Sequence, residues 1–172
     1  MMEHVDPRQQ KPLQPLDQDR LSCAWERPSA IAHEVTPLTN RWAAELGVAR
    51  FEPDWDRVFA LERAGTLAVW SARTLDRVLV GYAVCNWTRG LWLNQSFCRI
   101  DPFYLTPEWR GPIGVRYVKS LIVAIGRLTP GCTVEWETND DFQPDEHGRS
   151  RLAKLLERLN FRQVGTTFQR RV

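Results

Sequence analysis

The sequence predicts a mixed α/β domain with one central sheet, and three observations predict it. Two β-rich runs, 67–73 and 78–87, are separated by a short turn, as in a hairpin. A third β-rich run, 96–105, leads through a glycine turn into the clearest helical stretch, 113–128. An alternating run at 132–138 follows, and this succession of strands and helices is typical of helices packed on a single sheet.

The N-terminal third is expected to contribute an arm, a strand and helices. Residues 1–20 hold three prolines and four glutamines, and they bury too little apolar surface to offset the entropy of ordering, so we expect a flexible arm. Residues 21–26 form a candidate first strand. Residues 30–46 have a helical pattern that Pro37 is expected to divide in two, and a shorter helix is predicted over 54–64.

The C-terminal half has the stronger periodicity. Within 113–128 apolar side chains recur every four residues and so form one stripe along a helix: Ile113, Tyr117, Leu121 and Ile125. Residues 149–159 form a second amphipathic pattern, and 161–172 contain two short β-rich runs. Gly81 interrupts the second strand of the hairpin, which indicates a bulge or the close approach of another backbone.

Composition and charge exclude several classes of protein. At 172 residues one domain is the default, and a net charge of +2 is too small to indicate nucleic-acid binding by itself. No apolar run approaches the ~18 residues of a membrane span, and the N-terminus lacks the pattern of a signal peptide. The four cysteines are scattered without metal-ligand spacing, so we expect buried free thiols, no metal site and a cytoplasmic protein.

The most informative segment is 101–119. Its β-rich beginning ends in a turn with two glycines, Gly111 and Gly114, and the turn opens into the helix. A glycine turn exposes backbone N–H groups, and the start of a helix carries about half a positive charge, so this arrangement can hold a phosphate. Arg110 and Arg116 lie where they can add side-chain charge.

This pattern resembles the GNAT superfamily of acyl-CoA N-acyltransferases over about residues 21–172, which would form a single domain after the arm. Four segments match in the family's order: LVGYAV (79–84), FYLTPEWRGPIG (103–114), VEWETN (134–139) and the closing helix and strands (155–172). Within the family the chain looks most similar to a small phage-type group with the pattern ALE-x-AG-x-L (60–67). The resemblance implies a mixed, mostly antiparallel sheet flanked by helices, and acetyl-CoA as the cofactor.

The resemblance also implies where the cofactor binds. In the family the fourth strand splays from the fifth, the pantetheine arm inserts there, and amides of the loop hold the pyrophosphate. The residues that it assigns to the cofactor are Leu105, Thr106, Arg110, Gly111, Ile113, Gly114, Arg116 and Asn139. Two features depart from the family pattern. The loop is one residue short and contains Pro112, which has no N–H, and no Tyr follows Tyr117 to serve as general acid.

The candidates for the general base are Asp101 on the fourth strand and Glu135 and Glu137 on the fifth. A carboxylate beside an apolar cleft has a raised pKa, which suits a base near neutral pH. The alternative for each is an exposed carboxylate on a sheet face. Tyr104 is a candidate proton donor, and its alternative role is as a core aromatic.

The alternation of strands predicts which faces these residues share. Glu135 and Glu137 share one face, and they point outward if Trp136 packs inward. A second set is expected to share the face opposite Tyr104: Asp101, Phe103 and Leu105.

These patterns predict an acetyl-CoA-dependent N-acetyltransferase acting on an amine of a protein or a small molecule. The acidic run 135–146 would attract a cationic acceptor, and its alternative is a solvated loop. Two other functions on the same fold stay open: a catalytically reduced binding or scaffold protein of phage type, and a nucleobase modifier, against which the small net charge argues. No membrane partner is expected. The last strand, 166–170, would let two copies pair as a homodimer.

Overall fold

The computed structural model describes residues 21–90, 95–136 and 151–162. The chain divides into two compact units, 1–137 and 138–172. In chain order the first unit contains β1 (Ser22–Glu26), α1 (Pro28–Glu45), α2 (Trp55–Arg63), β2 (Leu67–Arg73), β3 (Leu79–Arg89), β4 (Ser96–Leu105), the 3-10 turn η2 (Pro107–Trp109), α3 (Pro112–Leu128) and β5 (Thr133–Trp136). The second contains α4 (Arg151–Arg158).

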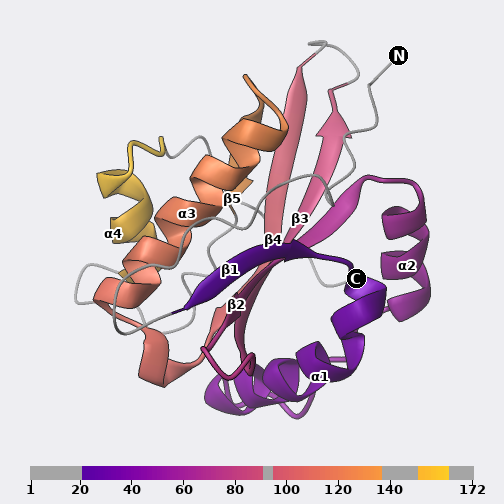
Figure 1. The fold of residues 1–172 in the computed structure, drawn as a ribbon, viewed down its shortest axis with the longest axis vertical. Helices are drawn as coiled ribbons and strands as arrows, with labels where there is room; N and C mark the ends of the chain where they lie inside the picture. The colour runs from indigo at the N-terminus through magenta and orange to yellow at the C-terminus, as the bar shows by residue number, and fades with distance from the viewer. Residues whose placement is uncertain (1–20, 91–94, 137–150, 163–172) are drawn as a thin grey trace. The chain divides into compact units, whose positions relative to one another are not determined.

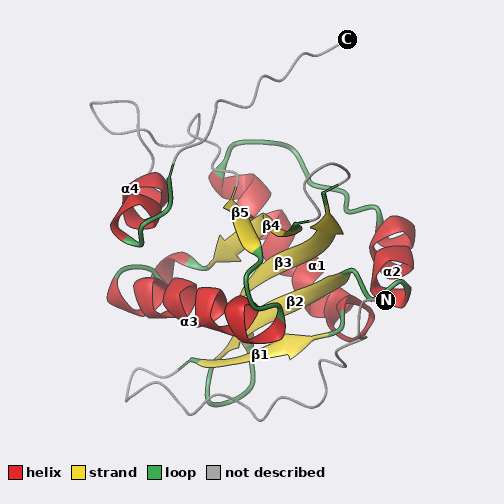
Figure 2. Cartoon of the chain, turned by 90° about the horizontal axis from the view of Figure 1, so that it is seen from above, coloured by secondary structure: helices red, strands yellow, loops and turns green. Residues whose placement is uncertain are grey.

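The first unit is built on a five-stranded sheet in the order β1-β2-β3-β4-β5 (Figure 1). The first three pairings are antiparallel, and β4 pairs with β5 in parallel. This confirms the predicted mixed α/β fold with a mostly antiparallel sheet, and β2 and β4 have the predicted bounds. Figure 2 shows the sheet from above, between α3 and the pair α1 and α2.

One face of the sheet is covered by α3. The predicted stripe is confirmed, because Tyr117, Leu121 and Ile125 are fully buried against the sheet. The hydroxyl of Tyr117 also donates to the carbonyl of Trp70 on β2 at 2.6 Å, which satisfies a buried polar group. Burial of this stripe, more than helix propensity, therefore fixes α3.

The other face is covered by α1. Ile31 and Val35 pack there with Tyr82 and Tyr104 of the sheet. The buried hydroxyls of Thr39 and Tyr82 form a hydrogen bond at 2.9 Å. Burial raises the pKa of Tyr82 to about 12, so its hydroxyl stays protonated near neutral pH.

The prediction that Pro37 divides the first helix is wrong, because α1 is continuous across it. A proline inside a helix removes one hydrogen bond and costs about 3 kcal/mol. Buried positions nevertheless recur every four residues on both sides of Pro37: Ile31, Val35, Thr39 and Ala43. This continuous buried stripe outweighs the local cost, which a sequence pattern does not measure.

A bulge changes the faces of β4. Ala83 lies opposite Phe103 and Cys85 lies opposite Ile100, so one residue of β3 faces two residues of β4. Ile100, Phe103 and Leu105 consequently all lie in the cluster under α3. The prediction that Asp101 shares a face with Phe103 and Leu105 is therefore wrong. Asp101 points to the α1 side and is exposed.

Three of the four cysteines are buried free thiols, as the sequence predicts. These are Cys23, Cys85 and Cys98, and Cys132 is half-buried and free. Burial raises the pKa of Cys23 to about 11, which keeps that thiol unreactive.

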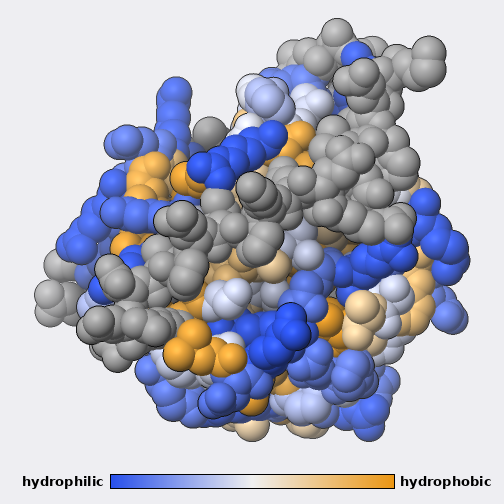
Figure 3. Space-filling view, viewed as in Figure 1, coloured by the Kyte–Doolittle hydropathy of each residue, from blue (hydrophilic) through white to orange (hydrophobic). Residues whose placement is uncertain are grey.

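Figure 3 shows the described surface of one face as mostly hydrophilic with scattered small hydrophobic areas. No described helix has the length and apolar character needed to cross a bilayer.

The second unit is described only over 151–162. Leu156 is buried, and the helix ends where Asn160 takes the left-handed conformation with a φ of 64°. The N–H of Phe161 then donates to the carbonyl of Leu156 at 3.0 Å, which completes the end of the helix. The sequence predicts two strand runs within 161–172. Residues 163–172 lie outside the described part of the chain, so these strands stay a prediction.

The sequence predicts a bulge or the close approach of another backbone at Gly81, and the register of β3 with β2 does shift beside it, between Gly81 and Leu79. A Cβ on Gly81 would lie 2.6 Å from Cδ1 of Leu105 and 3.0 Å from the carbonyl oxygen of Tyr104, which confirms a close approach. We expect Gly81→Ala to lower the free energy of unfolding by about 1–3 kcal/mol in urea titrations. The matched control is Gly126→Ala in α3, where a Cβ meets nothing within 4 Å, and it should raise stability. Equal effects of the two substitutions would contradict the prediction.

Candidate active site

The end of β4 extends past its described pairing with β5. The described pairing with β5 runs from Phe97 to Ile100, so Leu105 lies beyond it. The N–H of Thr106 donates to the carbonyl of Val80 on β3 at 2.9 Å. Neighbouring N–H groups of a strand point to opposite edges, so the N–H of Leu105 points to the β5 side.

The side chain of Leu105 fixes this end of the strand. Its Cδ1 abuts Gly81 of β3, and its Cδ2 would lie 3.3 Å from a Cβ on Gly114 of α3. The two glycines therefore let the strand end, the neighbouring strand and the helix approach one another. This gives the second glycine of the turn a packing role.

The turn between β4 and α3 presents backbone donors. Gly111 precedes α3 with a φ of 85°, a conformation that side chains disfavour, and a Cβ there would meet nothing within 4 Å. Val115 donates to the carbonyl of Gly111 at 3.0 Å, so the N–H groups of Ile113 and Gly114 precede the first intrahelical bond. Pro112, the first helical residue, has no N–H to offer.

Arg110 is directed back toward the sheet. Its Nε donates to the carbonyl of Leu105 at 2.8 Å, and its Nη2 pairs with Glu45 of α1 at 2.6 Å. The guanidinium also lies over the ring of Tyr104, 5.6 Å from the centroid. The side chain of Arg110 is thus held by three protein groups.

Tyr104 is part of the same contact. The residue is 2% exposed, and its hydroxyl donates to Glu45 at 2.6 Å. Burial, followed by the hydrogen bond to Glu45, raises the pKa of Tyr104 well above its ordinary value. The hydroxyl is therefore protonated and already engaged, which makes it a poor proton donor to a substrate.

Two candidate carboxylates share the face opposite α3. Trp136 packs under α3 against Phe103 with ring centroids 5.0 Å apart, so Glu135 points to the opposite face, as predicted. There Glu135 pairs with its strand partner Arg99 at 3.3 Å. Asp101, two residues after Arg99, lies on this face as well, and its charge contributes to the raised pKa of Tyr82.

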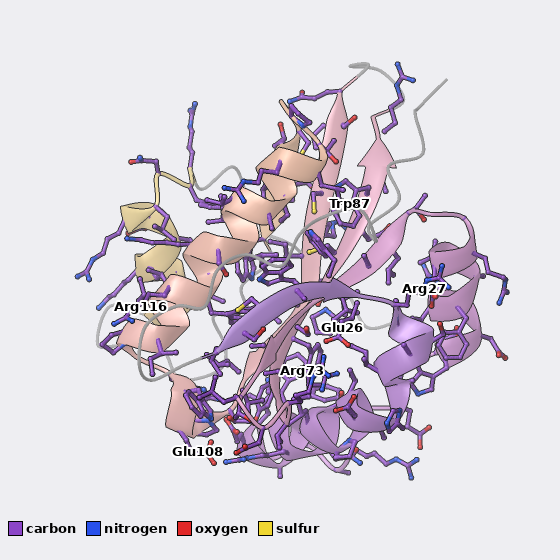
Figure 4. The ribbon with its side chains drawn as sticks, in the orientation of Figure 1. Glu26, Arg27, Arg73, Trp87, Glu108 and Arg116 are labelled. Carbon is purple, nitrogen blue, oxygen red and sulfur yellow. The ribbon has the colours of Figure 1, made fainter. Side chains whose placement is uncertain are left out.

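The predicted cofactor residues divide into groups. Leu105, Gly111, Ile113 and Gly114 lie together at the end of β4 and the start of α3. Thr106 is buried, while Arg116 is exposed on α3; Figure 4 labels it together with Glu108 of η2. Glu137 and Asn139 lie outside the described residues.

Glu45 was not anticipated from the sequence. It lies 59 residues from Tyr104 and 65 from Arg110, so no local spacing links the three. Within the described part of the chain, no group of three or more His, Cys, Asp or Glu side chains is arranged to hold a metal ion.

The sequence matches no protein-family model and has no significant similarity to a curated protein. The fold, in contrast, is similar to solved acetyltransferases. A ribosomal-protein-alanine N-acetyltransferase from Brucella melitensis biovar Abortus 2308 is 18% identical with a TM-score of 0.63, over 88% of this chain and 99% of that one. A Trypanosoma brucei acetyltransferase is 14% identical with a TM-score of 0.63, over 88% and 99%.

An aminoglycoside acetyltransferase from an uncultured soil metagenomic sample gives the same result. It is 14% identical with a TM-score of 0.65, over 88% of this chain and 96% of that one. The protein therefore has the GNAT acetyltransferase fold. At these identities the likeness defines the fold, and function depends on the residues described above.

Proposed function

We propose that the protein is an N-acetyltransferase that uses acetyl-CoA and acts on an amine. The observation that carries the proposal is the series of donors that runs from the end of β4, past its described pairing with β5, through Gly111 to the first turn of α3. The N–H of Leu105 points to the β5 side, and the N–H groups of Ile113 and Gly114 face the start of the helix. This series suits an extended ligand with a thioester at one end and a pyrophosphate at the other.

The residues present fit such a ligand. Open space at Gly111 lets the backbone approach an anion, and the missing N–H of Pro112 leaves the donors on either side in place. When bound, acetyl-CoA would supply an acetyl thioester: the amine nitrogen would bond to its carbonyl carbon, the amine proton would pass to a base, and the C–S bond would break to release a CoA thiolate that takes a proton from solvent. Leu105 would polarise the thioester carbonyl through its N–H.

Asp101 is the best candidate for the base that removes the amine proton. It is exposed on the α1 side of β4, at the bulge beyond the end of the described β5 pairing. Glu135 lies on the same face but within the described pairing of β4 with β5, and the hydroxyl of Tyr104 is buried against Glu45. We therefore assign the base to Asp101 and assign neither Glu135 nor Tyr104 a proton-transfer role.

The acceptor is proposed to be a cationic amine of a protein or a small molecule. Asp101 and Glu135 lie on one face of the sheet, where carboxylates favour an ammonium group. Solved proteins with this fold include a ribosomal-protein-alanine N-acetyltransferase and an aminoglycoside acetyltransferase, which supports an amine acceptor. The rest of the predicted acidic run, 137–146, lies outside the described residues.

A catalytically reduced binding protein of phage type is the second candidate. It is favoured by the side chain of Arg110, which is bound to Leu105 and Glu45, and by Pro112, since both reduce the donors available to a pyrophosphate. Cofactor binding without release of CoA thiol across a panel of amines would support this candidate.

Acetyl-CoA is expected to stabilise the protein. At about 100 times its Kd it should add about 2.7 kcal/mol, which corresponds to a rise in Tm of about 5–10 °C in a thermal melt. Gly111→Ala should reduce this rise, because a side chain would meet the anion. The matched control is Gly131→Ala, which has a similar positive φ of 76° at the other end of α3 and open space around it. No rise in the unmodified protein would contradict the proposal.

A further inference from the structure

One carboxylate joins three parts of the fold that meet at the end of β4. Glu45, the last residue of α1, accepts a hydrogen bond from Tyr104 on β4 and pairs with Arg110 in the turn before α3, both at 2.6 Å. Its two oxygens therefore bind two different elements. The side chain of Glu45 is 25% exposed, so both contacts are partly shielded from water.

The contact with Arg110 extends to the backbone of the proposed cofactor site. The Nε of Arg110 donates to the carbonyl of Leu105, and the N–H of the same peptide, on Thr106, donates to Val80. The Leu105–Thr106 peptide is thus held from both sides. Because that peptide follows directly on the N–H of Leu105, holding it also fixes the direction of that N–H.

Arg110 needs a partner to stay in this position. Its side chain is 45% exposed, and without Glu45 its remaining contacts among the described residues would be the Leu105 carbonyl and the face of the Tyr104 ring. A long side chain with that exposure gains rotamer freedom when it is released. The Arg41–Glu108 pair at 2.7 Å joins α1 to η2 at the same end of the sheet and is more exposed, and Glu108 also hydrogen-bonds with the side chain of Thr106.

We infer that Glu45 is a positioning residue for acyl transfer: it holds Arg110 on the Leu105 carbonyl and so orients the end of β4 that would bind the thioester. The inference rests on the proposed function for its catalytic consequence. Its structural part, the immobilisation of the Leu105–Thr106 peptide, can be measured without any cofactor.

The test is Glu45→Gln in the full chain, which keeps the size and an acceptor oxygen but removes the charge. We expect kcat for amine acetylation to fall about tenfold, with KM for acetyl-CoA changed less than about threefold. Hydrogen exchange of the Thr106 amide, followed by NMR without ligand, should become faster. The control is Glu52→Gln, whose exposed pair with Arg50 lies outside these contacts and which should change neither quantity.

A second variant keeps the test decisive if Glu45→Gln does not fold. Arg110→Lys retains the charge but lacks the fork that reaches both Leu105 and Glu45, so it should reproduce both effects. The double variant should change kcat and Thr106 exchange no more than either single substitution does, because the two substitutions remove the same connection.

The outcomes are distinct. The inference is overturned if Glu45→Gln changes neither kcat nor the exchange of the Thr106 amide. It is also overturned if Glu45→Gln binds acetyl-CoA more tightly at unchanged kcat. That second result would make Arg110 a ligand of the cofactor that Glu45 restrains. A protein that neither binds nor uses acetyl-CoA refutes the proposed function. In that case faster Thr106 exchange still supports the positioning contact, and unchanged exchange overturns it.

Discussion

Replacing Asp101 with Asn should lower kcat for amine acetylation about 100-fold while leaving the Kd of acetyl-CoA unchanged. The amide has nearly the shape of the carboxylate but cannot accept the proton of the attacking amine. Asp101 lies on the α1 side of β4, whereas the N–H of Leu105 lies on the β5 edge. The substitution should therefore affect proton transfer and leave the cofactor contacts intact.

The matched control for this prediction is Glu135→Gln on the same face of the sheet. Because Glu135 is paired with Arg99, we expect its loss to change kcat less than about threefold. Initial rates measured by thiol release at saturating acetyl-CoA would compare the two variants. A larger loss in Glu135→Gln than in Asp101→Asn would move the role of base to β5.

The fold could be predicted where one local pattern decided it. The apolar stripe of α3 has the helical repeat and is buried as a unit, and β2 and β4 keep the bounds of their β-rich runs. Pro37 shows where local reasoning fails. The cost of a proline is a local quantity, whereas the gain from burying both halves of α1 on the sheet depends on residues distant in sequence.

The candidate site could be predicted only in part, for the same reason. The glycine turn was recognisable because Gly111 needs a positive φ and Gly114 needs close packing, and both needs are local. The face of Asp101 was predicted wrongly, since one extra residue in β4 reverses the alternation. Arg110 was expected to face an anion, but its partner Glu45 comes from α1, 65 residues earlier.

Loss of Arg73 should cause the largest change in stability. Figure 4 shows Arg73 beside Glu26 in the first unit. Its guanidinium binds Glu26 at 2.7 and 3.0 Å and Glu34 at 2.7 and 2.8 Å, and it also donates to the carbonyl of Arg77 at 2.8 Å. It therefore joins the end of β2 to β1, α1 and the hairpin turn.

We expect Arg73→Met to lower the free energy of unfolding by about 3 kcal/mol at neutral pH. Methionine fills much of the space but leaves two half-buried carboxylates without a cation. Urea titrations would measure the loss. Arg41→Met is the control, because the Arg41–Glu108 pair is 45% and 58% exposed and should contribute less than about 1 kcal/mol. Equal losses would contradict a special role for Arg73.

The pH dependence of this loss distinguishes the ion pairs from simple packing. The hydrogen bond from Arg73 holds the pKa of Glu34 below its ordinary value of 4.5. A lowered folded-state pKa stabilises the protein above the unfolded pKa, and that stabilisation disappears as pH falls through the folded value. The difference between the unmodified protein and Arg73→Met should therefore be constant near neutral pH and shrink below about pH 4. A difference that persists there would mean that Arg73 acts through its packing alone.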